Sequence, residues 1–187
     1  MPPRPGQKEE SRARILASAG RGFRAHGYGG LGVDGLAKEA GVTSGAFYAH
    51  FKSKAAAFTA AVGKGMHDLL DGICAFQASR GAEWRAAFID FYLTERLTCA
   101  LGESCAMQSL ATDVARADPE ARAAFEAEFR QVIEATAHGG PRAEAIALLA
   151  LLSGGVSLAR AAQDPALAAE IADAVRVAAL ESVRRSQ

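Results

Sequence analysis

The sequence has few cysteines, few β-branched residues and no apolar run long enough to cross a membrane. Its 187 residues include three cysteines, Cys74, Cys99 and Cys105, an odd number without paired spacing. This pattern argues against a disulfide framework or a zinc site, and we expect neither metal nor cofactor. The longest uncharged apolar stretch, residues 145–159, falls short of the roughly 20 residues that a transmembrane helix needs.

The N-terminus also lacks the apolar core of a secretion signal, because it begins MPPRPGQKEE. We therefore expect a cytoplasmic protein with no membrane partner.

The composition favours helices, since half of the residues are apolar and alanine is frequent. Ser53, Ser104, Asp118 and Asp164 can each cap a helix, and proline follows both aspartates, as is common at a first helical position. No strand pattern is present. The sequence predicts an all-α fold of about nine helices, near residues 8–26, 33–40, 44–50, 54–79, 82–98, 104–117, 119–137, 141–162 and 165–184.

Charge is distributed unevenly along a chain whose formal net charge is zero. Residues 1–54 contain 9 basic and 4 acidic residues, whereas residues 55–187 contain 12 and 17. A basic first third suggests that only the N-terminal part has a polyanionic partner. A chance fluctuation of a solvated surface is the alternative.

The segment GVDGLAKEAGVTSGAFYAHFKSK, residues 32–54, has the features of a helix-turn-helix. Such a motif needs a small residue where its helices touch, a turn residue that tolerates positive φ and a shared apolar core. Ala37 and Gly41 fit the first two roles, and the core residues would be Leu36, Ala40, Val42 and Phe47. The second helix would enter the major groove of DNA by its N-terminal end. The predicted DNA-binding residues are Thr43, Ser44, Gly45, Ala46, Tyr48, His50, Lys52 and Lys54.

An ordinary helical hairpin within a core is the alternative interpretation of this segment. The basic excess, the two lysines after the aromatic residues and the simultaneous match of many spacings argue against it. Tyr48, His50 and Lys54 suit contacts to phosphates, which position a protein on DNA without reading its sequence.

These residues resemble the DNA-binding segment of the TetR family of bacterial transcriptional regulators. The resemblance lies in Leu36–Ala37, Ala40–Gly41–Val42, Thr43–Ser44–Gly45 and Tyr48, His50, Phe51 and Lys54. One departure is Leu31–Gly32, where the family commonly has a hydroxyl residue that caps its second helix and reaches a phosphate. The resemblance implies a homodimeric regulator, most often a repressor, that binds a palindromic operator and is released by a small-molecule effector. It also implies a DNA-binding domain over residues 1–53 and a ligand-binding and dimerisation domain over residues 54–187.

Aromatic and apolar residues of the second domain are candidates for a ligand cavity, although most such stripes are plain core. That a cavity exists is implied by the resemblance. The candidates are Met66, His67, Leu70, Trp84, Phe88, Phe91, Tyr92, Cys105, Met107, Gln108, Phe125 and Phe129.

The last two predicted helices are apolar on more than one side, which indicates burial against a second copy of the chain in a four-helix bundle. The predicted dimerisation residues are Leu148, Leu151, Leu152, Val156, Leu167, Ile171 and Val175.

Cys105 follows a helix-capping serine and could be a redox-sensitive thiol with Cys99 as its partner, or a small buried hydrophobe.

Two other functions remain open from the sequence. Cys105 with His138 or His67 could imitate a thiol enzyme, but no catalytic motif surrounds them, and we expect no enzyme. A helical interaction module without DNA binding is the second alternative.

Overall fold

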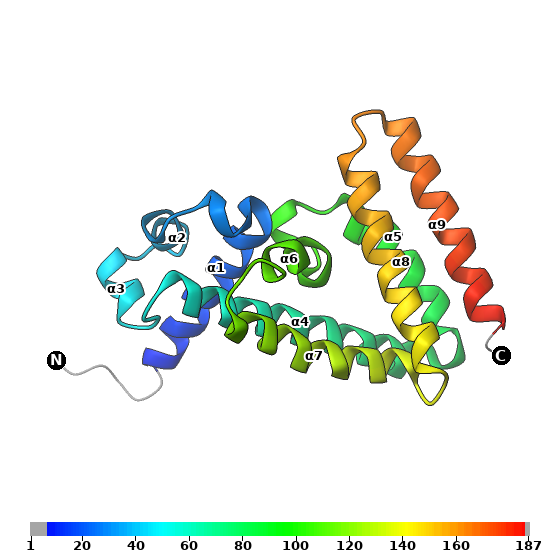
Figure 1. Ribbon diagram of the computed structural model, residues 1–187, viewed down its shortest axis with the longest axis horizontal. Coiled ribbons are helices and arrows are strands. Elements are labelled where there is room, and N and C mark those ends of the chain that lie inside the picture. The colour runs from blue at the N-terminus through cyan, green and yellow to red at the C-terminus, as the bar shows by residue number, and fades with distance from the viewer. Residues whose placement is uncertain (1–6, 186–187) are drawn as a thin grey trace.

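The computed structural model describes residues 7–185, and within this range every regular element is a helix (Figure 1). The predicted all-α fold is confirmed, with most boundaries within two or three residues of those expected. The helices are α1 Gln7–Gly30, α2 Val33–Glu39, α3 Ser44–Tyr48, α4 Lys54–Arg80, α5 Trp84–Thr98, α6 Ala106–Val114, α7 Pro119–Ala137, α8 Arg142–Ala161 and α9 Pro165–Arg185, with short 3-10 turns η1 Gly81–Glu83 and η2 Leu101–Glu103.

Side-chain caps fix several of the helix starts. The Ser53 hydroxyl accepts a hydrogen bond from the Ala56 amide (3.0 Å), and the Asp118 carboxylate accepts one from Ala121 (3.0 Å). The predicted Ser104 cap is wrong: α6 begins at Ala106 after Cys105, and no side chain caps it. Ser104 instead ends η2, where its hydroxyl donates to the Leu101 carbonyl.

The first helix runs further than predicted but bends at Gly27, which has φ 72° and ψ 171°. The bend falls where the sequence HGYGG predicted an end to the helix. The Asp113 carboxylate of α6 accepts a hydrogen bond from the Tyr28 amide (3.0 Å) just beyond it. Residues after the bend are therefore tied to α6.

Two hydrophobic cores lie along the molecule. The first joins α1, α2 and α3 to the N-terminal half of α4 and to α6, and it includes Ile15, Phe23, Leu36, Phe47, Phe58 and Leu110. The second joins the C-terminal half of α4 to α5, α7 and α8, and it includes Ile73, Trp84, Phe88, Val132 and Leu149. The long helix α4 contributes to both cores, so it connects the N-terminal head to the body. The predicted domain boundary at residues 53 and 54 stays a prediction, and residues 1–6 and 186–187 of those domains lie outside the described range.

The helix-turn-helix and the α8–α9 pair lie at opposite ends of the molecule, and α4 and α7 run beside each other between them (Figure 1). Among the described helices, α8 alone is long and apolar enough to cross a membrane by length and composition. Its buried residues Leu148, Leu149 and Leu152 pack inside the second core. The apolar character of α8 is therefore accounted for in part by the core of this fold.

Candidate nucleic-acid interface and internal cavity

The turn between α2 and α3 is built as the sequence predicts. Gly41 has φ 66°, a conformation that glycine adopts without strain. Its amide donates to the Lys38 carbonyl (3.0 Å), and the Val42 amide donates to Ala37 (3.0 Å). Ala37 is fully buried between the helices. These contacts hold α3 at a fixed angle to α2.

The outer surface of α3 presents small residues and one large ring. Thr43, Gly45, Tyr48 and Lys52 are exposed, and Tyr48 keeps 53% of its surface accessible. The remaining predicted DNA-binding residues, Ser44, Ala46, His50 and Lys54, are half-buried.

Both hydroxyl groups at the start of α3 have partners within the protein. Thr43 caps α3 by accepting from the Ala46 amide (3.1 Å). The Ser44 hydroxyl donates to the Asp34 carboxylate of α2 (2.5 Å). No side chain caps the start of α2, where Gly32 stands. The N-terminal end of α3 is thus pinned to α2, with its backbone near the surface.

Cation–π contacts position two basic residues of the head. The Lys54 ammonium lies 4.5 Å from the centre of the Tyr28 ring, and the Arg12 guanidinium lies 5.2 Å from the centre of Phe51. Sequence reasoning proposed Lys54 as a phosphate contact but missed that Tyr28 holds it. Arg12 was missed as well, because its distance from residues 32–54 in the sequence hides its closeness in the fold.

A cavity of about 550 Å³ lies between the head and the body, within the size range of small-molecule sites. Helices α4 and α5 and the segment from η2 to α6 form most of its wall, and α1 contributes Arg24. Its lining residues are Arg24, Gly65, Asp68, Leu69, Gly72, Ala75, Phe76, Ser79, Arg80, Phe88, Phe91, Tyr92, Arg96, Glu103, Ser104, Cys105 and Ala106.

Four of the predicted ligand-binding residues line this cavity: Phe88, Phe91, Tyr92 and Cys105. Burial raises the pKa of the Tyr92 phenol well above its ordinary value, with smaller contributions from the neighbouring Cys105 thiol. Cys105 is a free, buried thiol, and its role as a redox sensor stays a prediction.

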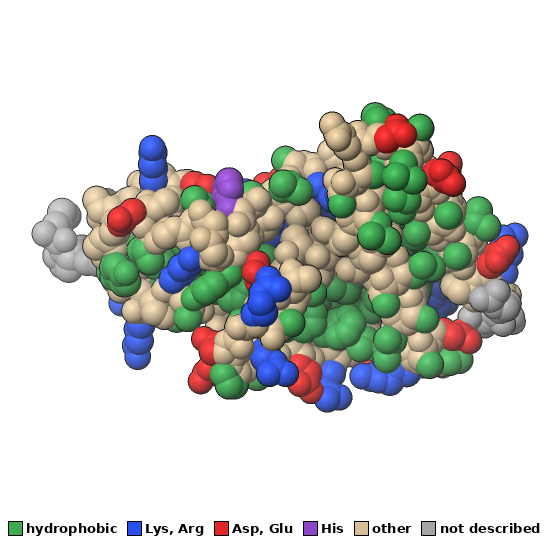
Figure 2. Space-filling view, turned by 45° about the horizontal axis from the view of Figure 1, so that its top comes forward, with side chains coloured by type: hydrophobic (Ala, Val, Ile, Leu, Met, Phe, Trp, Pro, Cys, Tyr) green, Lys and Arg blue, Asp and Glu red, His purple; other side chains and the backbone are tan. Residues whose placement is uncertain are grey.

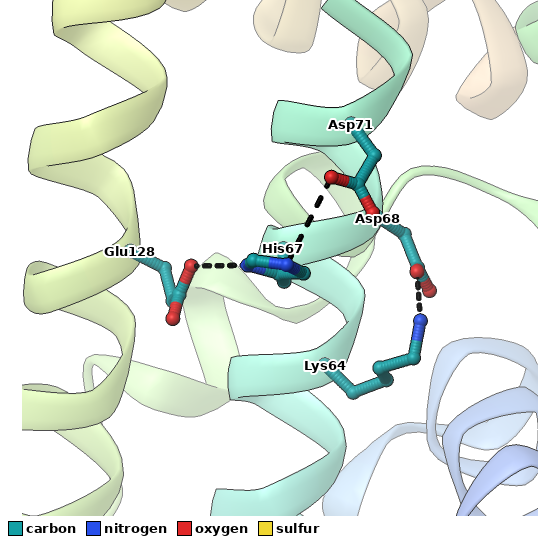
Figure 3. Close-up of polar contacts among 5 residues, drawn as sticks. All are labelled: Lys64, His67, Asp68, Asp71 and Glu128. Carbon is teal, nitrogen blue, oxygen red and sulfur yellow. Dashed lines mark hydrogen bonds and ion pairs between the residues drawn. The ribbon is translucent and has the colours of Figure 1, made fainter. Parts of the chain in front are cut away.

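His67 does not line the cavity, and Figure 3 shows it pointing toward Glu128 of α7. Its Nδ1 lies 3.2 Å from the Glu128 carboxylate, and its Nε2 lies 3.8 Å from Asp71. The reason is helical geometry: α7 packs along α4, and the face of α4 that carries His67 meets α7 rather than α5. His67 therefore forms part of the α4–α7 contact.

The remaining predicted ligand-binding residues do not line the cavity either, because they pack within the cores. Met66, Trp84 and Met107 are buried, while Leu70, Phe125 and Phe129 pack against the same apolar clusters. The Gln108 amide donates to the Ser157 hydroxyl of α8 (3.1 Å). Sequence reasoning missed Arg24, Phe76 and Arg96, and an arginine on α1 gives no local sign that it reaches the body.

The predicted dimerisation residues differ in how far they are buried within the single chain. Leu148, Leu152 and Val156 are buried inside this chain, so these three residues are not available to a second copy. They occupy the face of α8 that packs into the body. Val175 packs against Gly155, where an added methyl carbon would lie 2.6 Å from Val175 Cγ2, and Ile171 and Leu151 are half-buried.

Leu167 of the predicted set faces outward on α9, together with other apolar residues of α8 and α9. Leu158 is 64% exposed, Val177 55% and Leu167 47%, and Ile146 is also exposed. Ala147, Ala150 and Gly154 add small residues to the exposed side of α8. Hydrophobic side chains accordingly gather over the α8–α9 end of the molecule (Figure 2). This outward surface, centred on Leu158 and Val177, is called the α8–α9 face below.

Histidine, cysteine and acidic side chains do not gather into metal-binding groups of three or more anywhere in the described part of the chain.

Comparison with known proteins gives a family match in the head and a fold match over the whole chain. Residues 15–61 match the family described as bacterial regulatory proteins, tetR family. A search of curated protein sequences found no match. Solved structures at or below 23% identity share the fold.

Three of these structures illustrate the likeness. SCO4454, a TetR-family transcriptional regulator from Streptomyces coelicolor, is 23% identical with a TM-score of 0.73, and the match covers 95% of this chain and 96% of that one. A TetR-family regulator from Agrobacterium tumefaciens is 19% identical with a TM-score of 0.76, covering 91% and 97%. The reduced form of Escherichia coli NemR is 20% identical with a TM-score of 0.74, covering 89% and 95%.

Proposed function

We propose that this chain is a TetR-family regulator that acts as a homodimeric repressor, binds a palindromic operator and is released by a small-molecule effector; the family match of residues 15–61 and the shared fold support the proposal. The observation that carries the proposal is the helix-turn-helix. Its turn at Gly41 holds α3 outward, at the end of the molecule opposite to α8 and α9. Such a regulator works in the cytoplasm, where its DNA is.

The N-terminal end of α3 supports a role in reading the major groove. Gly45 and Ala46 have almost no side chain, so the helix backbone can approach base edges closely. Tyr48 and Lys52 project from the exposed side, where they can contact phosphates and set the position of the head on DNA. The basic excess of residues 1–54 favours the same polyanionic partner.

The α8–α9 face supports the dimer. Exposed leucine and valine side chains beside small residues form an apolar surface that water covers in a single chain. A second copy packing its α8 and α9 against the same face would bury that surface and form a four-helix bundle. The two heads would then meet two half-sites related by two-fold symmetry, about 34–36 Å or a near multiple apart.

The connection between the cavity and the head supports release by a ligand. Helix α4 contributes to both hydrophobic cores and lines the cavity along its middle and C-terminal turns. A ligand that prefers one position of α4 also changes the spacing of the two heads, so ligand and DNA compete through two conformations.

Two rival functions predict a different behaviour toward DNA or a different arrangement around Cys105. A helical interaction module would have no salt-dependent affinity for DNA. A thiol enzyme would need a base beside its nucleophile, yet His67 pairs with Glu128, and His138 lies beside the Trp84 ring at 6.0 Å between ring centres. Neither histidine lines the wall that contains Cys105.

Selection from a random pool of duplex DNA tests the proposed function directly. The wild-type protein should enrich one two-fold symmetric sequence, and footprinting should show two protected half-sites on the same face of the duplex. Tyr48→Ala should weaken this binding, whereas Tyr28→Phe, which keeps the ring under Lys54, should leave it nearly unchanged. Failure to enrich any sequence, or protection of one asymmetric site, would refute the proposal.

A further inference from the structure

The cavity contains more basic than acidic side chains. Arg24, Arg80 and Arg96 line it against Asp68 and Glu103. Asp68 is already engaged, because the Lys64 ammonium of the preceding turn of α4 pairs with its carboxylate (Figure 3). The positive charge of the cavity therefore exceeds the negative charge, although the chain as a whole has a formal net charge of zero.

Arg24 reaches the cavity from α1 and has no carboxylate partner among the described residues. Its Nε donates to the Gly102 carbonyl of η2 (2.7 Å), which holds the side chain across the junction between head and body. Burial lowers the pKa of the guanidinium, and the more distant charges of Glu103 and Asp68 offset this effect in part. The remaining N–H groups of a half-buried arginine are thus left for another acceptor.

Arg96 is placed in a similar way. Its Nη1 donates to the Glu103 carbonyl (2.7 Å), and its guanidinium lies 5.2 Å from the centre of the Phe91 ring. Within the described range it also forms no ion pair with a carboxylate. Two guanidinium groups near η2 are therefore held by backbone carbonyls, which orient them without neutralising their charge.

Tyr92 contributes a buried polar group to the same wall. Its side chain is 1% exposed, and the Cys105 thiol is the polar neighbour of its hydroxyl, which forms no other hydrogen bond among the described residues. A thiol is only a weak hydrogen-bonding partner.

Aromatic rings form the rest of the wall. Phe76 packs against Phe88 with 5.7 Å between ring centres and against Phe91 with 5.3 Å. All three rings line the cavity. A flat apolar body can lie against such rings in stacked or edge-on contact.

We propose that the effector is a small aromatic anion, with its rings against Phe76, Phe88 and Phe91 and its anionic group bound by Arg24 and Arg96. Carboxylate and sulfonate groups both present oxygens that the planar donors of arginine can bind in pairs.

This assignment rests on the proposed function and adds a route for the switch. Arg24 belongs to α1, so an anion that binds it pulls directly on the head rather than acting through α4 alone. The Arg24–Gly102 hydrogen bond uses Nε alone, so it can stay in place while the anion binds the remaining N–H groups.

Two fluorescent probes with the same ring system test the proposal. 8-Anilinonaphthalene-1-sulfonate is anionic, and N-phenyl-1-naphthylamine is the same skeleton without the sulfonate. Each is titrated into the purified full-length protein without DNA, and energy transfer from Trp84, the single tryptophan, reports binding near the cavity. The anion should bind with one site per chain, about ten-fold or more tighter than the neutral probe, as expected for charge-assisted hydrogen bonds.

Variants test whether Arg24 is responsible for the preference for the anionic probe over the neutral one. Arg24→Gln should reduce affinity for the anion toward that for the neutral probe and leave the neutral probe unchanged. Arg24→Lys keeps the charge and should retain a preference for the anion. Arg122→Gln makes the same charge change on the exposed surface of α7, outside the cavity, and should behave as wild type.

Equal affinities for the two probes, an Arg24→Gln protein that still prefers the anion, or no saturable binding of either probe would each overturn the proposal. None of these results depends on DNA. A protein that enriches a palindrome but shows no preference for the anion would refute the ligand class alone. A protein that prefers the anion but enriches no DNA sequence would refute the proposed function alone.

Discussion

Gly65, which has no side chain, allows α4 and α6 to approach each other closely. A methyl group added at Gly65 would lie 2.5 Å from the Ala106 Cβ, closer than carbon atoms can pack. The same addition at Gly63, two residues earlier on the same helix, meets nothing within 4 Å. Both glycines have the same low helix propensity, but only Gly65 packs against another helix.

We therefore predict opposite effects for the same substitution at these two positions. Gly63→Ala should raise the free energy of unfolding by up to about 1 kcal/mol, the difference in helix propensity. Gly65→Ala should lower it by about 1–3 kcal/mol, because α6 must move away from α4. Denaturant unfolding of the two variants measures both changes. Stabilisation by both would show that α4 and α6 are not in close contact.

The buried Tyr92 phenol makes stability sensitive to alkaline pH. Its pKa in the folded protein lies well above the ordinary value of 10.0, because burial disfavours the ionised form. The unfolded chain therefore loses this proton first. Above pH 10 the folded state is penalised by about 1.4 kcal/mol per pH unit for this group, until its own pKa is reached.

Tyr92→Phe should remove that part of the pH dependence. The comparison uses denaturant midpoints of wild type and variant between pH 8 and the start of alkaline unfolding, since lysine and arginine titration affects both proteins equally. Parallel curves for the two proteins would contradict the assigned burial of the hydroxyl.

Helix ends show how far the sequence determines the elements. Ser53 and Asp118 cap helices where the sequence predicts caps. Ser104 is an exception, because a 3-10 turn between α5 and α6 uses its hydroxyl and moves the helix start to Ala106. Local patterns predicted the helices well, since capping and turn chemistry act within a few residues.

Which side of each helix packs against which neighbour could be predicted less well. The sequence showed that α8 and α9 are apolar on more than one side, but which side of a helix meets which neighbour depends on how the helices dock. His67 pairs with Glu128 of α7, and Leu148 points into the body, for this reason. Arg24 enters the cavity wall through a contact between α1 and η2 that joins residues far apart in sequence.

The cap at Ser53 anchors the helix that joins head to body. Ser53→Ala removes the acceptor for the Ala56 amide and should lower the free energy of unfolding by about 1 kcal/mol. Ser79→Ala is the control, because that hydroxyl donates only to carbonyls of its own helix, Ala75 and Phe76. Thermal unfolding should show a lower midpoint for Ser53→Ala and little change for Ser79→Ala. Equal shifts would indicate that the cap does not stabilise α4.

The assembly of two chains depends on the α8–α9 face. Leu158→Glu places a charge on this face but outside the core of a single chain, so the chain should fold normally and fail to dimerise. Leu101→Glu alters a similarly exposed leucine, 52% accessible, in η2. Sedimentation at micromolar concentration should give dimers for wild type and Leu101→Glu and monomers for Leu158→Glu. A wild-type monomer, or a dimeric Leu158→Glu, would place the interface elsewhere.

The claim that most depends on the whole molecule is that the basic head binds DNA through phosphates while α3 reads the sequence. The most direct test is the affinity for the selected palindrome as a function of salt, measured by fluorescence anisotropy. The account predicts a linear fall of log K with log salt, with a slope of about −0.9 for each neutralised phosphate. Lys52→Ala should reduce the slope by about 1, whereas Lys64→Ala, in the body and paired with Asp68, should leave it unchanged. An affinity that does not vary with salt, or a slope that Lys64→Ala changes and Lys52→Ala does not, would contradict the account.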